Sequence, residues 1–166
     1  DANAVVRESA EDYVLKSVKE LQVKQTHAVT ILNSAGDEFS TVVIPYNPNT
    51  KVSSIKVEVY DAAGKLSKTY SKKDFNDYTN NPSAALYVDD RILVLRPMSS
   101  QYPYTVKSYY ETTTSNTVYL NYFRPVTSYD ISVQKSTFTV HNTSGINIRT
   151  KVTERPLAKL TNSTEG

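Results

Sequence analysis

The stretch "SIKVEVYDAAGKLSKTY" (Ser54–Tyr70) decides the fold class. In its first half, the apolar residues Ile55, Val57 and Val59 alternate with polar or amphipathic ones, which is the period of a strand with one buried and one wet face. The next five residues, "DAAGK" (Asp61–Lys65), carry the Asp and Gly of a tight turn, and "LSKTY" continues as a second strand. The stretch therefore predicts a β-hairpin.

The same alternation recurs along most of the chain and predicts about ten short strands. Strand patterns stand at "LQVKQTHAVTIL", "EFSTVVIP", "YTVKSYYE", "TVYLNYF", "YDISVQKSTFTV" and "INIRTKV". Helical periodicity is lacking, although "SKKDFNDY" (Ser71–Tyr78) can hold one helical turn capped by Ser71. We therefore predict an all-β fold with little or no helix: an antiparallel β-sandwich, with an open barrel as the alternative. One domain is expected over residues 1–155, followed at 156–166 by a polar tail or a truncated edge or linker.

Two local features refine this architecture. The segment "NSAGD" (Asn33–Asp37) lies between two strand patterns and predicts a second hairpin turn, in which Gly36 supplies a positive φ. In "YDISVQKSTFTV", the apolar positions are odd at the start and even at the end. We expect Tyr129, Ile131 and Val133 to share a buried face with Phe138 and Val140. Because each step along a strand reverses the side chain, this requires a bulge or a corner near Lys135–Thr137 that interrupts the ladder between Gln134 and Phe138.

Composition excludes several classes of function. The chain of 166 residues has a net charge of +2 and no cysteine, so it has no disulfide, no thiolate zinc site and no Cys nucleophile. Basic residues are scattered, which argues against nucleic-acid binding. No apolar run is long enough to span a membrane. The 13 tyrosines, with many Thr, Ser and Val, are common in secreted β-proteins, and the sequence starts without the basic and apolar regions of a signal peptide.

No arrangement of residues indicates catalysis, a metal or a cofactor. His27 shares its strand face with apolar residues and is interpreted as a hydrogen-bonded histidine at the sheet margin, with a ligand or general base as the alternative. With His141 on another strand, it makes a poor zinc site. The segment "DFNDYTNN" (Asp74–Asn81) is interpreted as a solvated Asx-rich turn, because Tyr78 and Thr79 stand where a calcium loop needs an oxygen donor and a glycine.

Asp89 and Asp90, in "YVDDRILVLRP", precede an apolar run. The side chains of consecutive strand residues point to opposite faces, so the two carboxylates cannot both bind one substrate atom. The paired carboxylates of a glycosidase must face one site. We interpret the pair as the solvent-exposed start of a strand whose residues from Ile92 to Leu95 are covered on both faces.

Tyrosines are the remaining candidates for binding. They occur at both parities of "QYPYTVKSYYE" and "VYLNYF", so some of them face away from the core. An exposed tyrosine can stack on sugar rings or form a protein interface, although cross-strand pairing also explains it. The candidate residues for a protein partner or a glycan are Tyr102, Tyr109 and Tyr119.

Five segments, in order, carry a family resemblance: "DANAVVRESAEDYVL", "HAVTILNSAGDEFSTVVIPYNP", "SIKVEVYDAAGKLSK", "YVDDRILVLRP" and "YTVKSYYE". Over residues 1–152, the chain resembles the N-terminal β-domain of unknown function that precedes transglutaminase-like (papain-like cysteine) cores in envelope proteins of Bacteroidetes-type bacteria. It departs from that family at "MSSQYP", where a glycine-bearing loop is usual.

The resemblance implies a non-catalytic scaffold or recognition domain of a periplasmic or surface protein. Its partner would be a protein or peptide, or a transglutaminase- or protease-like module downstream on the same polypeptide. The Cys, His and Asp of that module have no counterparts here, so we expect the chain itself not to be an enzyme. The alternative is a module that binds carbohydrate, such as peptidoglycan or another cell-wall polymer, through exposed tyrosines.

Overall fold

The structure is a computed structural model that describes residues 2–80, 89–118, 120 and 122–149. Within this part the element order is β1 (Ala4–Ser17), β2 (Glu20–Ile31), the 3-10 helix η1 (Ser34–Ser40), β3 (Val42–Tyr46), β4 (Thr50–Tyr60), β5 (Leu66–Tyr70), the 3-10 helix η2 (Lys72–Asp74), β6 (Asn76–Thr79), β7 (Arg91–Leu95), β8 (Tyr104–Thr114), β9 (Ile131–Val133) and β10 (Ser136–Asn142). The predictions of an all-β fold, about ten strands and little helix are confirmed.

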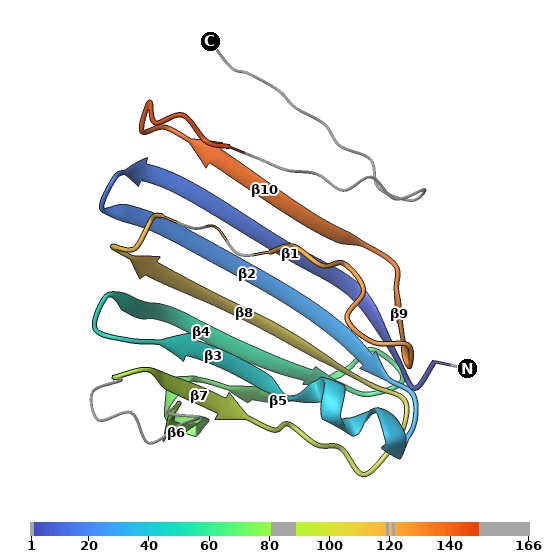
Figure 1. Cartoon of the computed structure of the whole chain (residues 1–166). Coiled ribbons are helices and arrows are strands. Elements are labelled where there is room, and N and C mark those ends of the chain that lie inside the picture. The colour runs from blue at the N-terminus through green and yellow to red at the C-terminus, as the bar shows by residue number, and fades with distance from the viewer. Residues whose placement is uncertain (1, 81–88, 119, 121, 150–166) are drawn as a thin grey trace.

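The strands form two sheets of unequal size. The large sheet has the order β10-β1-β2-β8-β4-β5, with β9 also paired to β1, and the small sheet has the order β3-β7-β6. The long strands β1, β2, β8 and β4 run side by side as one curved layer (Figure 1). The fold is a sandwich, and the described strands form no closed barrel. The described pairings are antiparallel, as predicted for the sandwich, except those of β1 with β9 and β10, which are parallel.

The hairpin predicted from "DAAGK" connects β4 to β5. Gly64 has a φ of 77°, in the region that only glycine enters without strain, and the Asp61 carboxylate accepts hydrogen bonds from the N–H groups of Ala63 (3.0 Å) and Lys65 (2.9 Å). The predicted faces of β4 are also confirmed, since Val57 and Val59 are buried.

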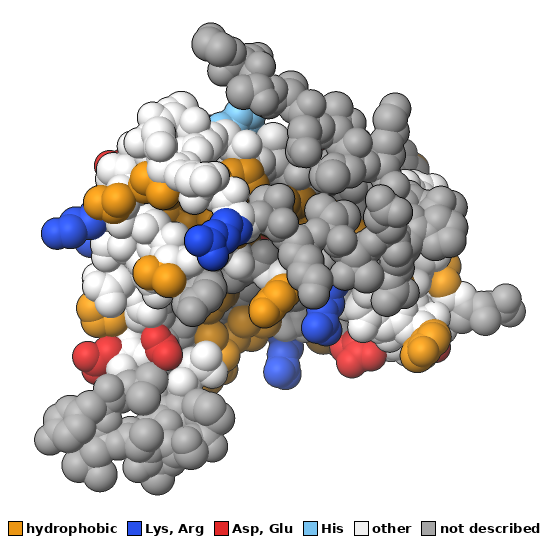
Figure 2. All heavy atoms as spheres, turned by 45° about the horizontal axis from the view of Figure 1, so that its top comes forward, with side chains coloured by type: hydrophobic (Ala, Val, Ile, Leu, Met, Phe, Trp, Pro, Cys, Tyr) orange, Lys and Arg blue, Asp and Glu red, His pale blue; other side chains and the backbone are white. Residues whose placement is uncertain are grey.

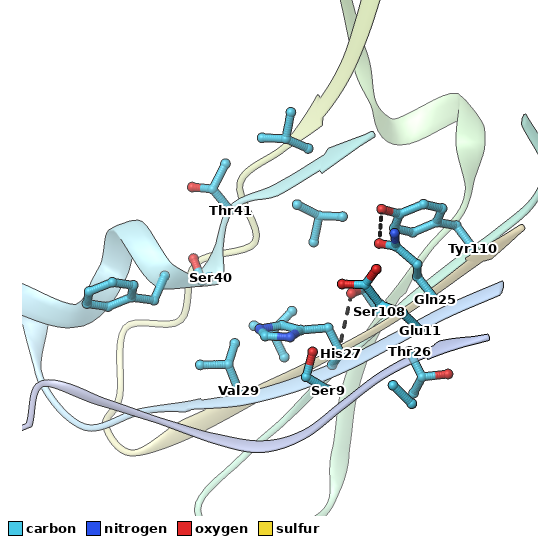
Figure 3. A pocket seen from close by; sticks show the side chains of 15 residues that line it. Ser9, Glu11, Gln25, Thr26, His27, Val29, Ser40, Thr41, Ser108 and Tyr110 are labelled. Atoms are coloured by element: carbon cyan, nitrogen blue, oxygen red, sulfur yellow. Dashed lines mark hydrogen bonds between the residues drawn. The ribbon is translucent and has the colours of Figure 1, made fainter. Parts of the chain in front are cut away.

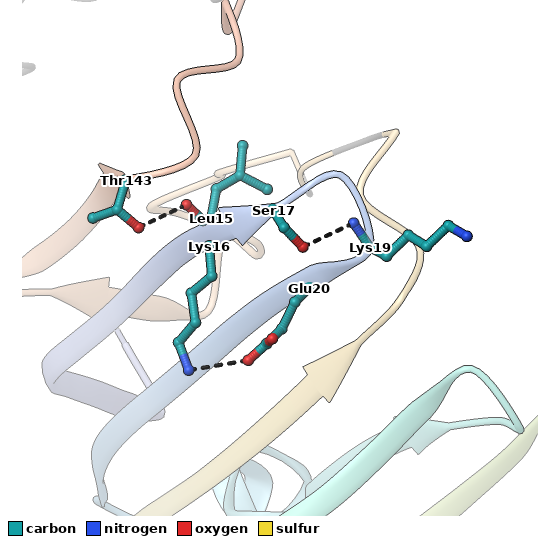
Figure 4. Close-up of polar contacts among 6 residues, drawn as sticks. All are labelled: Leu15, Lys16, Ser17, Lys19, Glu20 and Thr143. Atoms are coloured by element: carbon teal, nitrogen blue, oxygen red, sulfur yellow. Dashed lines mark hydrogen bonds and ion pairs between the residues drawn. The ribbon is translucent and has the colours of Figure 1, made fainter.

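A second hairpin joins β1 to β2 and is tied to the end of β10 (Figure 4). The Ser17 hydroxyl accepts a hydrogen bond from the N–H of Lys19 at 3.2 Å, and Lys16 forms an ion pair with Glu20 at 3.1 Å. The N–H and the hydroxyl of Thr143 both donate to the carbonyl of Leu15. The chain leaving β10 is thereby attached to β1.

The predicted hairpin turn at Asn33–Asp37 is wrong. The segment forms η1, capped by the Asn33 side chain, and it carries the chain from β2 in the large sheet to β3 in the small one. Gly36 does not have a positive φ. It is required for close approach instead, because a Cβ at this position would lie 2.3 Å from the carbonyl oxygen of Asn3.

The predicted interruption near Lys135 is confirmed, since β9 ends at Val133 and β10 begins at Ser136. Both strands pair with β1 in the same register, Ala4 opposite Ile131 and Ser9 opposite Ser136, so the strand does not change sheets. A matching shift lies in β1 itself, between Val6 and Glu8, where one residue is added relative to β2.

Two other predictions in this region are wrong. Tyr129 is fully exposed rather than buried, because β9 begins only at Ile131. The described residues of "TVYLNYF" form no strand, and both Val118 and Tyr122 are exposed. The described part of "INIRTKV" is likewise irregular, with Ile146 and Ile148 packed against a core cluster.

Two apolar clusters cover the inner face of the large sheet. The main cluster joins both sheets and includes Val29, Ile31, Ile44 and Leu93, whereas the minor cluster holds Tyr13, Leu15, Leu21 and Val23. On β2, both clusters use odd-numbered residues, and β2 pairs with β8 without a shift in register. The two clusters therefore occupy opposite ends of one face.

The remaining local predictions concern the small sheet. Ser71 precedes the single helical turn η2, as expected, and its N–H donates to the Asp74 carboxylate at 2.7 Å. Asp89 is exposed, Asp90 is half-buried, and β7 begins directly after them, which confirms a strand boundary. None of the described helices is long and apolar enough to cross a membrane. The expected tail at 156–166 lies outside the described residues.

We predict that Gly36→Ala destabilises the fold by about 1–3 kcal/mol, the typical cost of forcing a methyl group into an occupied position. Chemical denaturation measures the change. Gly64→Asn is the control, because Asn tolerates the left-handed conformation and nothing lies within 4 Å of the added Cβ. Equal stability of the Gly36→Ala variant and the wild type would contradict the close approach of η1 to Asn3.

Candidate functional site

A pocket of about 210 Å³ opens between the middle of the large sheet and the start of the small one. Its wall is the segment from the end of η1 into β3 (Figure 3). Its floor comes from β1, β2 and β8, and the polar residues on the inward face of these strands are Ser9, Glu11, Gln25, His27, Ser108 and Tyr110. The pocket lies between the two apolar clusters, where the inner face of the large sheet turns polar.

Strand register explains why these side chains point inward. Glu11 pairs with Gln25, which pairs with Tyr110, and the neighbouring row joins Ser9, His27 and Ser108 in the same way. Directly paired residues of a sheet share a face. The rows flanking these two contain Val23 and Val29, which belong to the apolar clusters on the same face. The pocket floor is thus two polar rows within an otherwise apolar face.

The wall of the pocket includes the start of β3, which has a free edge. This strand pairs with β7 on one side and ends the small sheet on the other. Both Val42 and Val43 line the pocket. Because the side chains of consecutive strand residues point to opposite faces, we infer that the backbone between them borders the pocket. Pro45 lacks an N–H and cannot donate to β7, so its carbonyl is expected to point to the unpaired side of β3. Alternate residues of a strand direct their backbone N–H and C=O groups to the same side, so those of Val43 also point away from β7. Among the described residues, no backbone hydrogen bond outside the strand ladders is made by Val43.

Hydrogen bonds hold the acidic end of the pocket. The Tyr110 hydroxyl donates to the Gln25 side-chain oxygen, and the Tyr13 hydroxyl donates to Glu11 Oε2 at 2.9 Å. Burial, together with the negative charge of Glu11, raises the pKa of Tyr110. The tyrosine is therefore a neutral donor at every physiological pH.

His27 lies on the core side of its strand, as predicted, but it is not at the sheet margin. It belongs to β2, an interior strand, and its half-buried imidazole points into the pocket (Figure 3). Within the described part of the chain, the imidazole has no hydrogen-bond partner, which corrects the interpretation as a hydrogen-bonded residue. Burial lowers the pKa of His27 below its ordinary value of 6.5, so the ring is neutral at pH 7.

The candidate tyrosines do not form one surface. Tyr102 is partly exposed, packs against Tyr104 at 5.6 Å between ring centroids, and donates a hydrogen bond to the Asp37 carboxylate at 2.7 Å. Tyr109 is half-buried on the outer face of β8, where its hydroxyl donates to Glu111. Tyr119 lies outside the described residues. Because Tyr104 faces inward and Tyr109 outward, Tyr102 and Tyr109 offer no shared stacking platform.

The segment interpreted as an Asx-rich turn is a strand over most of its described length. Within β6, Asp77 accepts hydrogen bonds from the Tyr46 hydroxyl (2.6 Å) and from Arg91 Nε (3.0 Å). The bonds from Tyr46 and Arg91 lower the pKa of Asp77. No group of three or more His, Asp or Glu side chains in the described part of the chain is placed to hold a metal ion.

Sequence reasoning missed most of the pocket. His27 was identified, but Glu11, Gln25 and Ser108 were not. A signal was present, because Gln25 and His27 stand at the odd, core-facing positions of "LQVKQTHAVTIL". Two polar residues in succession at core positions indicate that the sheet is not covered there by apolar side chains.

Comparison with protein families identifies the chain. A family model described as "Domain of Unknown Function with solved-structure structure (DUF3857)" matches residues 19–166. The chain belongs to the DUF3857 family. The expected resemblance to a β-domain of unknown function is confirmed at this level, while the link to transglutaminase-like cores stays a prediction. None of the curated proteins compared with the chain matches it.

A solved structure shares the fold of this DUF3857 domain. It is the crystal structure of a "putative protease" from Parabacteroides distasonis ATCC 8503, with a TM-score of 0.71 and 14% sequence identity. The match covers 84% of this chain and only 29% of the other, so this chain spans less than a third of the protein that it resembles.

We predict that His27 makes the stability of the domain depend on pH. Its pKa is lowered in the folded state, so the unfolded chain binds more protons between the folded pKa and about 6.5. The stabilisation is fully present above pH 6.5 and decreases as the pH falls toward the folded pKa. Denaturation of His27→Gln across pH 5–8 should show a weaker pH dependence than the wild type. His141→Gln, which changes an exposed residue, should leave the wild-type curve unchanged, and an unaltered slope in His27→Gln would refute the prediction.

Proposed function

We propose that this DUF3857 domain is a non-catalytic recognition domain that binds an extended polypeptide segment. The segment would lie in the pocket between β3 and the polar rows of the large sheet. It would belong to a substrate or partner, which the domain positions for a protease-like or transglutaminase-like module of the same polypeptide.

The free edge of β3 is the observation that carries this proposal. An unpaired strand edge offers N–H and C=O groups in the spacing of another strand, and binding by strand addition uses those groups. Val43, whose backbone polar groups lie on the unpaired side of β3, lines the pocket, while Gln25 and Ser108 line it from the large sheet. A peptide backbone placed there meets donors and acceptors on two sides.

The size of the pocket supports a peptide over a cofactor. Sites for small molecules and cofactors usually have roughly 300–1,000 Å³. The volume here is about 210 Å³, which suits one side chain of a peptide whose backbone continues along the open edge.

Two observations support the role in a larger protein. The structurally similar chain is described as a "putative protease", and the match covers only 29% of it. The resemblance to domains that precede transglutaminase-like cores favours the same arrangement, and it also favours the bacterial envelope as the location. On the face shown in Figure 2, Lys and Arg side chains are scattered, which suits a protein ligand better than a nucleic acid. The glycan-binding alternative stays a prediction that the placement of Tyr102 and Tyr109 does not favour.

We predict that an end-blocked octapeptide of alternating Thr and Val, with one central Lys, binds at the β3 edge. Titration of the isotope-labelled chain, followed by NMR, should shift the amide signals of Thr41–Ile44 together with those of Gln25 and Ser108. Methylating every second backbone nitrogen of the peptide removes the pairing N–H groups. Because a hydrogen bond contributes about 0.5–1.5 kcal/mol, losing several should weaken binding on the order of tenfold or more.

Variants of β3 provide the matched controls. Val43→Pro removes the N–H offered at the free edge and should weaken binding, whereas Val43→Ala retains it and should not. Equal binding of the methylated and unmethylated peptides, or shifts confined to the edges formed by β5 or β10, would overturn strand addition at β3.

A further inference from the structure

The charged lining of the pocket is negative. Among the residues that the structure describes, Glu11 is the only Asp, Glu, Lys or Arg that lines it. His27, the other titratable neighbour besides Tyr110, is neutral at pH 7, because burial lowers its pKa. A pocket with one uncompensated carboxylate and no cation attracts a positively charged group.

One oxygen of the Glu11 carboxylate remains available. Oε2 accepts the hydrogen bond from Tyr13, while Oε1 has no partner within the described residues. The carboxylate points into the pocket (Figure 3). Tyr13 is 2% exposed and packs against Phe138 at 4.8 Å between ring centroids, so its bond fixes the position of the carboxylate.

Further acceptors line the same pocket. The Ser9 and Ser108 hydroxyls flank His27 on the neighbouring strands. The Ser108 hydroxyl donates to the His27 carbonyl at 3.4 Å, which leaves its lone pairs facing the pocket. A neutral imidazole also presents one nitrogen lone pair. An ammonium group has three N–H donors, and the carboxylate, a serine hydroxyl and the imidazole together can accept all three.

The other end of the pocket is apolar. Val29 and Val106 lie on the floor and Phe39 on the wall. Val29 and Val106 are each 1% exposed and belong to the main cluster. The half-buried ring of Phe39 is therefore the apolar surface that suits a methylene chain entering from the β3 edge and ending at Glu11.

We propose that this pocket is a lysine subsite, in which Glu11 binds the ammonium group of a lysine side chain from the peptide held at the β3 edge. The inference rests on the proposed peptide binding and adds the identity of the recognised side chain. It assigns Glu11 as the specificity residue and the apolar wall as the surface that packs against the lysine stem.

The geometry favours lysine over arginine. A guanidinium group binds a carboxylate best through two parallel hydrogen bonds, which need both carboxylate oxygens. Here one oxygen is already bound to Tyr13. An ammonium group is a compact charge that needs a single oxygen and a few neutral acceptors, and these are what the pocket offers.

The test compares three fluorescent octapeptides that differ only at the central residue: lysine, arginine or norleucine. Fluorescence anisotropy with the wild-type chain should show that the lysine peptide binds on the order of tenfold or more tightly than the norleucine peptide, with arginine between them. Glu11→Gln still accepts the bond from Tyr13 but has no charge, so it should abolish the preference for lysine while norleucine binding stays unchanged. Asp12→Asn is the matched control, because it removes a charge one residue along on the opposite face, and it should retain the preference.

The outcomes separate the two proposals. If all three peptides bind with equal affinity, or if Glu11→Gln retains the preference, the lysine subsite is overturned and peptide binding stands. If none of the peptides binds, both are overturned. A loss of preference in Asp12→Asn would also overturn the assignment to Glu11, because the effect would then reflect the net charge of the chain.

Discussion

The architecture depends on a single added residue in β1, between Val6 and Glu8. Before it, the even residues Ala4 and Val6 face the core, and after it the odd residues Tyr13 and Leu15 do. The neighbouring strands β9 and β10 adapt to the added residue, because both keep the same register with β1. Between these two strands, the N–H of Gln134 donates to the carbonyl of Val6 at 2.9 Å. Without the added residue, every side chain of β1 from Glu8 onward would turn to the other face.

This register shift links the core to the pocket, because it also turns Glu11 inward. A carboxylate at mid-sheet is costly unless its lone pairs have partners or access to water. Glu11 has a partner in the Tyr13 hydroxyl and an open pocket on its other side. The two apolar clusters at the ends of the face supply the burial that holds the sheets together, so the middle of the face can be polar. Departures from local patterning of this kind are most often found at functional sites.

The sequence was sufficient to predict the strands and their faces where both depend on nearby residues. The β4–β5 hairpin followed from alternation and turn chemistry within one short stretch, and the break before β10 followed from a change of parity. Sequence could not predict what depends on distant partners. The turn at Gly36 was misread because its restraint is the carbonyl of Asn3, more than thirty positions away along the chain. The pocket was missed for the same reason, since Glu11, Gln25 and Tyr110 meet only once β1, β2 and β8 are paired.

The edges of β3 and β5 differ in a way that bears on the proposed recognition by β3. A free strand edge invites association with other chains, and proteins usually protect such edges with charges, short strands or proline. The five-residue strand β5 is almost wholly exposed, and the Lys68 ammonium lies 4.5 Å from the ring centre of Tyr70, which keeps a charge at this edge. The edge of β3 contains Pro45 but borders a pocket. The polar rows of the large sheet line the same pocket, which is why the proposed peptide would lie between these rows and the edge of β3.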